Sequence, residues 1–192
     1  DQLGAGQWTD TEHDLSITLA GQVLAPRPTQ GSIGAHLLAD YKRLGLEMVE
    51  AMRGGFVMAI RDGDTVHLVR DGVGVRTLVW AQHEGRTVFA VESKGITAVP
   101  GFPRRLRPAA IAQYLSFSFV PGAGTMLEGI EEMLPGHTLT LRPGHAPKLR
   151  RWFYFEHPEA SDELTEEEWV SRVADTTALA VAERMPSNRP FA

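Results

Sequence analysis

The segment from Gly55 to Val99 constrains the fold more than any other part of the sequence, because it predicts short strands joined by tight turns. Asp62-Gly63 and Glu84-Gly85 separate runs of apolar and β-branched residues, and such pairs supply the positive φ angles of a two-residue hairpin. The predicted strands cover residues 56–60, 65–69, 76–82 and 86–91. Four consecutive strands with short connections predict an antiparallel sheet.

Two of these strands are apolar on both faces. Phe56–Ile60 and Val88–Val91 lack the alternation of a strand with one side in water. Strands of this kind are covered on both sides. We therefore expect helices on one side of the sheet and a second sheet on the other.

The flanking sequence adds helices and further strands. Ser32 is predicted to cap a helix that runs to Leu44 and ends at Gly45. Thr165 and Glu168 form a capping box that opens a long helix through about Arg184. The other expected elements are a strand at 14–19, a loop at 25–31, a short helix at 47–52, a helix at 109–115, a loop at 118–136, and strands at 137–141 and 148–155. The sequence thus predicts an α+β domain over residues 1–155, then an acidic linker (156–163) and a second unit over 156–192.

Composition excludes several classes of function. The formal charge is −5 and the basic residues are scattered, the densest run being Arg104, Arg105 and Arg107. A nucleic-acid-binding protein needs a concentrated basic surface, so we expect no nucleic-acid partner. No apolar run reaches the roughly 18 residues of a membrane span, and we expect no membrane partner and a cytoplasmic location. The chain contains no cysteine, so it can supply neither a disulfide, a thiolate zinc site nor a thiol nucleophile.

General motifs point to no reaction. Asp10, Glu12, His13 and Asp14 resemble a metal-ligand cluster, but nothing fixes them on one face, and we interpret them as a solvated segment without a metal. Gly72-Val73-Gly74 follows a strand as a phosphate loop would, but another strand follows it, so it is interpreted as a turn. Composition and spacing alone therefore predict a soluble α+β domain without a recognisable chemistry.

Longer motifs carry a resemblance to a known protein family. The segment from residue 45 to residue 99 resembles the glutamine amidotransferase domain of asparagine synthetases. Residues 70–78 are similar to its "RD-x-x-G-x-x-P-L" signature, with Thr77 in place of proline, and residues 89–96 to its "F-A-S-E-x-K-A-L" stretch. Further matches follow in order up to Trp152. The signature residues expected to have structural roles are Arg70, Asp71, Gly74, Glu92, Lys94, Pro135, Gly136 and His137. The resemblance implies a four-layer αββα sandwich of the N-terminal-nucleophile hydrolase type, and we expect its first strands to be missing from this chain.

The resemblance also assigns the glutamine pocket, and here the sequence departs from the family. Residues 19–25 align with "F-N-G-E-I-Y-N", so that Ala20 replaces the asparagine of the oxyanion hole, Gly21 keeps its backbone N–H, and Gln22 replaces a glutamate. Ile33 replaces the aspartate that binds the substrate's ammonium group. The family's cysteine and arginine belong to a first segment without a recognisable counterpart here. The resemblance therefore implies an inactive, glutaminase-like domain with no catalytic residue in this chain.

Residues 165–185 and 190–192 resemble the first helix and strand of the family's ATP-binding synthetase domain. We therefore expect a longer, ATP-dependent, amide-forming ligase, similar to beta-lactam synthetases and lasso-peptide cyclases, in which this domain is a scaffold. The expected partner is its own C-terminal synthetase domain, which would use ATP and Mg²⁺; no cofactor is expected in this chain, and homodimerisation, common among relatives, is left open. One alternative is a divergent glutamine-hydrolysing asparagine synthetase whose N-terminal cysteine segment is missing from the chain. A third hypothesis is a free-standing interaction module of the same fold.

Overall fold

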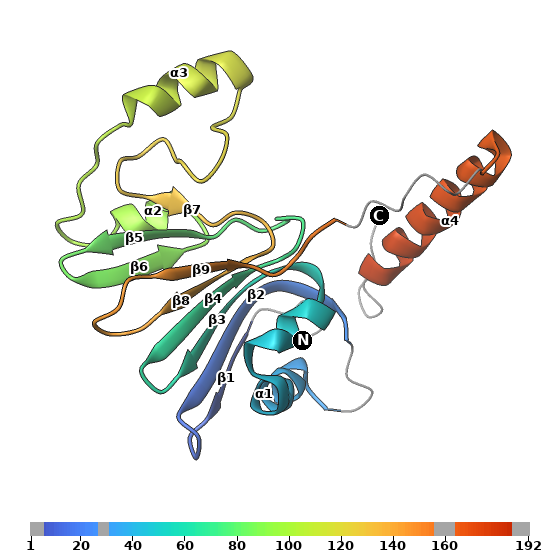
Figure 1. The fold of residues 1–192 in the computed structure, drawn as a ribbon, viewed down its shortest axis with the longest axis horizontal. Helices are drawn as coiled ribbons and strands as arrows, with labels where there is room; N and C mark the ends of the chain where they lie inside the picture. Colours follow the sequence, from blue (N-terminus) through green and yellow to red (C-terminus); the bar gives the residue numbers. More distant parts are fainter. Residues whose placement is uncertain (1–5, 27–30, 156–163, 186–192) are drawn as a thin grey trace. The chain divides into compact units, whose positions relative to one another are not determined.

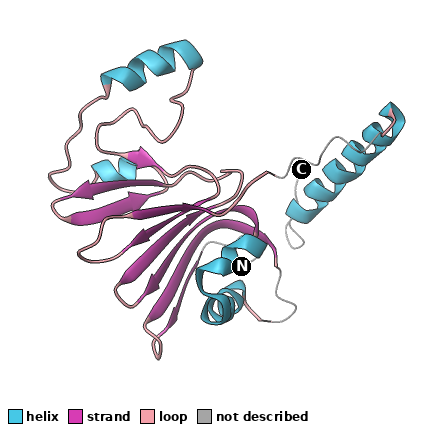
Figure 2. Cartoon of the chain, viewed as in Figure 1, coloured by secondary structure: helices cyan, strands magenta, loops and turns pink. Residues whose placement is uncertain are grey.

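The computed structural model describes residues 6–26, 31–155 and 164–185, whose helices and strands are shown in Figures 1 and 2. The strands are β1 (Gly6–Asp10), β2 (Leu15–Ala25), β3 (Arg53–Asp62), β4 (Thr65–Arg70), β5 (Val79–His83), β6 (Arg86–Ala90), β7 (Glu131–Glu132), β8 (His137–Leu141) and β9 (Lys148–Arg151). The helices are α1 (Ile33–Leu44), the 3-10 helix η1 (Gly45–Ala51), α2 (Ser93–Thr97), α3 (Pro108–Phe117) and α4 (Glu166–Arg184). The chain divides into two compact units at Tyr154/Phe155.

The first unit contains two antiparallel sheets. The larger has the order β1-β2-β3-β4-β8-β9 and the smaller β6-β5-β7. The prediction of a single sheet from residues 56–91 is therefore wrong: β3 and β4 belong to the larger sheet, and β5 and β6 to the smaller. The division occurs because the segment between β4 and β5 leaves the larger sheet at Asp71, whose carboxylate organises the following turn.

Three apolar clusters join the elements into four layers. The first lies between α1 with η1 and one face of the larger sheet, and it includes Leu37, Met48 and Phe56. The second lies between the two sheets, where Val57 of β3 meets residues around β5 and β8. The third covers the outer face of the smaller sheet and includes Ile96 of α2. The resulting order of helix, sheet, sheet and helix confirms the predicted αββα sandwich.

Local signals located the turns and caps well. The Ser32 hydroxyl accepts a backbone N–H of the first turn of α1, and Gly45 follows the helix with a φ of 61°. The hairpin positions Gly63 (54°), Glu84 (49°) and Gly85 (73°) also have positive φ, as two-residue hairpin turns require.

Several elements differ from expectation. β1, α2 and β7 were not predicted, because they are short and partly polar. The strand predicted at 14–19 continues to Ala25. The strands predicted at 76–82 and 148–155 are each trimmed at one end, since β5 begins at Val79 and β9 ends at Arg151. Phe89 of β6 is 42% exposed, so the prediction that this strand is covered on both faces is wrong. Val88 and Ala90 pack against the third cluster, and Phe89 between them is directed to the other face.

The second unit is described by its helix alone. In α4 the Thr165 hydroxyl accepts the N–H of Glu168, and the Glu168 carboxylate accepts the N–H of Thr165, which confirms the capping box. None of its side chains is buried. Residues 27–30 and the predicted linker 156–163 lie outside the described residues. Across the helices of the described segments, none combines the length and the apolar character needed to cross a membrane.

Candidate functional site

The second half of β2 carries three of the four positions assigned to the glutamine pocket. Ala20 lies opposite Val57 of β3, and its side chain packs against the apolar cluster between the two sheets. Gly21 has a φ of 116°, and a Cβ added there would overlap the carbonyl oxygen of Gly55. Gln22 lies opposite Gly55. Since alternate residues of a strand share a face, Ala20 and Gln22 are directed to the side between the sheets.

The fourth position lies elsewhere. Ile33 is the first residue of α1, and it packs against the apolar cluster between the helices and the larger sheet. Ala20 packs against the cluster on the opposite face of that sheet. The structure therefore brings Ala20, Gly21 and Gln22 together and separates Ile33 from them.

These four positions offer little chemistry. The side chains are a methyl group at Ala20, none at Gly21, a neutral amide at Gln22 and an apolar chain at Ile33. An ammonium group is held by carboxylates or other acceptors, and a thioester-forming reaction needs a nucleophile with a base or a lowered pKa. These residues offer an ammonium group only the neutral amide oxygen of Gln22, and none of them is a nucleophile.

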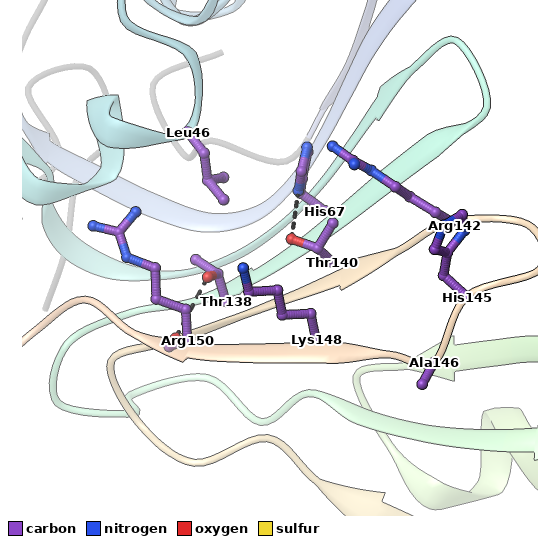
Figure 3. A pocket seen from close by; sticks show the side chains of 9 residues that line it. All are labelled: Leu46, His67, Thr138, Thr140, Arg142, His145, Ala146, Lys148 and Arg150. Atoms are coloured by element: carbon purple, nitrogen blue, oxygen red, sulfur yellow. Dashed lines mark hydrogen bonds between the residues drawn. The ribbon is translucent and has the colours of Figure 1, made fainter.

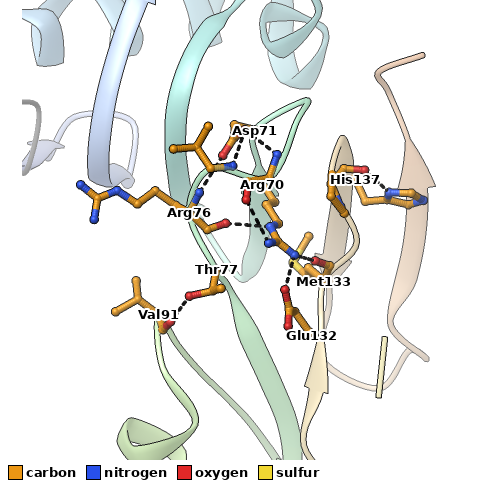
Figure 4. A network of polar contacts seen from close by, with 11 residues as sticks. Arg70, Asp71, Arg76, Thr77, Val91, Glu132, Met133 and His137 are labelled. Carbon is orange, nitrogen blue, oxygen red and sulfur yellow. Dashed lines mark hydrogen bonds and ion pairs between the residues drawn. The ribbon is translucent and has the colours of Figure 1, made fainter. Parts of the chain in front are cut away.

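The best-defined polar centre lies in the turn between the two sheets, at Asp71 (Figure 4). Its side chain is fully buried. One carboxylate oxygen accepts the backbone N–H groups of Val73 (3.2 Å), Gly74 (2.7 Å) and Val75 (3.0 Å), and the other accepts that of Arg76 (3.2 Å). One side chain thus satisfies four successive donors and fixes the path of the chain from β4 to the smaller sheet.

The neighbouring Arg70 ties the same turn to β7. It is 5% exposed, its Nε donates to the carbonyl of Arg76 (2.7 Å), and its guanidinium also donates to the carbonyls of Gly74 and Met133. Its ion-pair partner is Glu132, at 2.7 Å. The two signature residues are therefore not each other's partners: Asp71 holds the turn internally, and Arg70 attaches it to the second sheet (Figure 4).

Other signature residues join this centre through the backbone. Gly136 donates its N–H to the Asp71 carbonyl (2.8 Å) and has a φ of 67°. Gly74 lies so close to Pro135 that an added Cβ would come within 2.6 Å of the proline ring. His137 begins β8, and its Nδ1 lies 2.8 Å from the carbonyl oxygen of Pro135. Arg70, Asp71, Gly74, Pro135, Gly136 and His137 thus form one region.

Glu92 and Lys94 do not join it. Their side chains form an exposed ion pair with a separation of 2.5 Å, in which Glu92 raises the pKa of Lys94. The segment is attached to the turn by Thr77, whose hydroxyl donates to the carbonyl of Val91 (2.6 Å). Thr77 stands where the family signature has proline, so this bond depends on the departure from the signature.

The acidic segment at the end of β1 is engaged in local contacts. Potential ligand atoms of Asp10, Glu12 and His13 lie within 4.8 Å of one another. The Asp10 carboxylate forms an ion pair with Lys42, and His13 lies 3.1 Å from it. The hydrogen bond from Lys42 is the main cause of a lowered pKa of Asp10, to which His13 also contributes. The cluster thus forms part of a surface ion-pair network, and Asp14 contacts Arg61 separately.

Sequence reasoning missed a buried polar group on the helix side of the larger sheet. The Tyr41 hydroxyl donates to Asp62 (3.1 Å), and burial with the Asp62 charge raises the pKa of Tyr41 to about 12. His67 lies beside Tyr41 with the ring centroids 6.3 Å apart, and burial lowers its pKa. The detectable signal was a histidine inside an otherwise apolar strand, at residues 65–69.

The four layers and the turn held by the buried Arg70 and Asp71 agree with a domain of the glutamine amidotransferase type. The chain belongs to the glutamine amidotransferase domain family, whose model matches residues 32–153.

Curated relatives support this membership. The chain is 27% identical to amidase chry2 of Gibberella zeae over 81% of its own length and 23% of the relative's. It is 26% identical to glutamine-hydrolysing asparagine synthetase 1 of Bacillus subtilis (80% and 24%) and 29% identical to a putative glutamine-hydrolysing asparagine synthetase of Mycobacterium bovis (76% and 23%). A solved glutamine phosphoribosylpyrophosphate amidotransferase from B. subtilis is similar with a TM-score of 0.48 and 16% identity, covering 77% of this chain and 31% of that one. The chain spans about a quarter of the length of the curated relatives it matches.

Proposed function

We propose that this glutamine amidotransferase domain does not hydrolyse glutamine and instead serves as a scaffold for an ATP-dependent, amide-forming synthetase domain of the same polypeptide. The observation that carries the proposal is the placement of Ile33. Where a substrate-binding aspartate is expected, an apolar side chain packs into the cluster beneath α1. That position contributes to the core and offers nothing to an ammonium group.

The substitutions at Ala20 and Gln22 support the same conclusion. Removing one donor from an oxyanion hole typically lowers the rate about 10²–10³-fold. Ala20 has no donor in its side chain, and the neutral Gln22 cannot supply the charge of the glutamate it replaces. All three positions lie within the first unit of the chain.

The scaffold role is supported by exposed apolar side chains and by the length of the relatives. Leu115 is 80% exposed, and Phe117 and Phe119 are 59% and 61% exposed. Apolar patches of this kind mark surfaces that contact other domains or proteins. The curated relatives are about four times as long as the matched region, and we infer that their remaining part corresponds to the domain that covers this patch. ATP and Mg²⁺ would be bound by that domain, and we place the protein in the cytoplasm.

Glutamate release from glutamine tests the catalytic part of the proposal. The full-length protein is expected to release no glutamate above the buffer blank, while B. subtilis asparagine synthetase 1 provides the positive control. Saturable glutamate release that is lost on mutation of a cysteine in the full-length protein would overturn it. That result would instead support a divergent glutamine-hydrolysing asparagine synthetase, the alternative that the names of two relatives favour.

Two further measurements test the packing of position 33 and the scaffold role of the domain. Ile33→Asp should destabilise the domain by about 2 kcal/mol, because it places a carboxylate in an apolar cluster, whereas Ile33→Val should cost less than about 1.5 kcal/mol. Tolerance of the aspartate would argue that position 33 faces an open binding site. For the scaffold, amide hydrogen exchange of α3 should be slower in the full-length polypeptide than in the 192-residue chain; equal rates would contradict a covering domain.

A further inference from the structure

A cavity of about 340 Å³ opens on the helix side of the larger sheet, on the face opposite to Ala20 (Figure 3). It lies beside η1 and over β4, β8 and β9. The residues that matter for its chemistry are His67, Thr138, Thr140, Arg142, Lys148 and Arg150. The volume lies within the range of small-molecule sites, and no acidic side chain lines it.

The strand register explains why these side chains converge. Thr140 of β8 lies opposite His67 of β4 on one side and opposite Lys148 of β9 on the other. Thr138 lies opposite Arg150 in the same way. Because alternate residues share a face, all five are directed to one side of the sheet. The polar residues that alternate along β8 and β9 therefore line the cavity, and the leucines between them are directed to the opposite face of the sheet.

The floor of the cavity is polar and buried. Thr138 is 1% exposed and His67 is 8% exposed. The Nδ1 atom of His67 lies 3.0 Å from the Thr140 hydroxyl, and the other ring nitrogen lies on the side of Arg142 (Figure 3). The Thr138 hydroxyl is also paired, since it donates to the carbonyl of Arg150 (3.4 Å), so the ring nitrogen of His67 on the side of Arg142 is the floor atom that we expect an occupant to bind.

The rim carries three cations, one of which is paired, and Asp62 lies near enough to His67 to act on its pKa. Arg150 forms an ion pair with Glu50 at 2.5 Å. By contrast, among residues 6–26, 31–155 and 164–185, Arg142 and Lys148 have no carboxylate within 4.0 Å. Two unpaired cations match the charge of one phosphate dianion. A concave site lined by one sign of charge also concentrates the opposite ion.

We propose that this cavity binds a phosphate-bearing small molecule, with the phosphate held between Arg142 and Lys148 above His67. Arginine and lysine donate charge-assisted hydrogen bonds to phosphate oxygens. When the Thr140 hydroxyl donates to Nδ1, the Nε2 of His67 carries the proton and provides a third donor. The site is independent of the glutamine pocket, so it stands whether or not the domain hydrolyses glutamine.

Inorganic phosphate tests the proposal in amide ¹H–¹⁵N spectra of the 192-residue chain at constant ionic strength. Saturable shifts are expected at the amides of β4, β8 and β9, and acetate at the same concentration should produce weaker ones because it carries a single charge. Replacing both cations (Arg142→Gln with Lys148→Gln) should weaken phosphate binding about tenfold or more.

The matched control removes two exposed cations outside the cavity (Arg86→Gln with Arg105→Gln). It changes the net charge equally and should leave phosphate binding unchanged. Equal weakening in both double variants would show only a general charge effect and overturn the proposal, as would shifts that increase linearly without saturation. The exposed positions of all four residues make retained folding of both variants the expected state, and the dispersion of the same spectra verifies it.

Discussion

Replacement of Asp71 gives the most direct test of how the two sheets are connected. The carboxylate is fully buried and accepts four backbone N–H groups at 2.7–3.2 Å. A hydrogen bond to a charged group contributes about 1.5–3 kcal/mol, but water can reach part of the turn once the acceptor is lost, because Val73 and Val75 are exposed. We therefore expect Asp71→Ala to lower the free energy of unfolding by about 3–5 kcal/mol.

The asparagine variant refines the test. Asp71→Asn can keep the oxygen that accepts three N–H groups, but its amide nitrogen would then face the N–H of Arg76, donor against donor. The expected cost is smaller, about 2 kcal/mol. Urea denaturation followed by tryptophan fluorescence measures both, with the exposed hairpin variant Asp64→Asn as the control. If the free energy of unfolding of Asp71→Ala lay within about 1 kcal/mol of that of the unchanged protein, the turn would not depend on this carboxylate.

Three further predictions concern the pKa of His67, the close packing of Gly74 and the capping box of α4. Burial lowers the pKa of His67 below its ordinary 6.5. As the pH falls, the unfolded chain therefore binds a proton at this histidine before the folded chain does. The free energy of unfolding should be greatest above pH 6.5 and should decrease as the pH falls below it. The decline should be shallower in His67→Gln, and an identical slope would refute the assignment. Gly74 and Gly144 have φ angles of 74° and 71°, but only Gly74 would place a Cβ against a neighbour. Gly144→Ala should cost about 1–2 kcal/mol and Gly74→Ala about 1–3 kcal/mol more, measured by urea denaturation; equal costs would contradict the close packing. Thr165→Ala should speed amide exchange in the first turn of α4 through loss of about 1 kcal/mol of capping energy, and unchanged exchange would show that the box contributes nothing.

The elements that could be predicted were those with local signals. Ser32 and Gly45 set the ends of α1 through bonds and angles that involve only a few neighbouring residues. The β3–β4 hairpin was also predicted, although it turns at Gly63-Asp64, one residue later than the predicted Asp62-Gly63 pair. The four-layer order followed from the resemblance and from apolar strands that need cover on both faces.

The parts that could not be predicted depend on distant partners. Nothing within residues 70–78 reveals that the chain changes sheets there, because Arg70 is satisfied by Glu132 and Met133, which are about sixty residues away in the sequence. β7 is a two-residue strand that pairs with β5, about fifty residues away in the sequence. The family motif assigned the pocket positions. It could not show that Ile33 of α1 and Ala20 of β2 pack on opposite faces of the larger sheet, because this depends on the tertiary fold.

The carboxylate of Asp71 has a consequence for how this domain tolerates change. The path of residues 73–76 is set by backbone groups bonded to one acceptor, so the exposed side chain of Val73 is not needed for these hydrogen bonds, whereas that of Val75 lies against Gly55. The proline of the family signature is equally dispensable here, since Thr77 holds the same place through its bond to Val91. Position 73 therefore accepts a variety of side chains on a backbone that Asp71 holds, and libraries that vary it would place new recognition groups on this fold without redesigning its backbone.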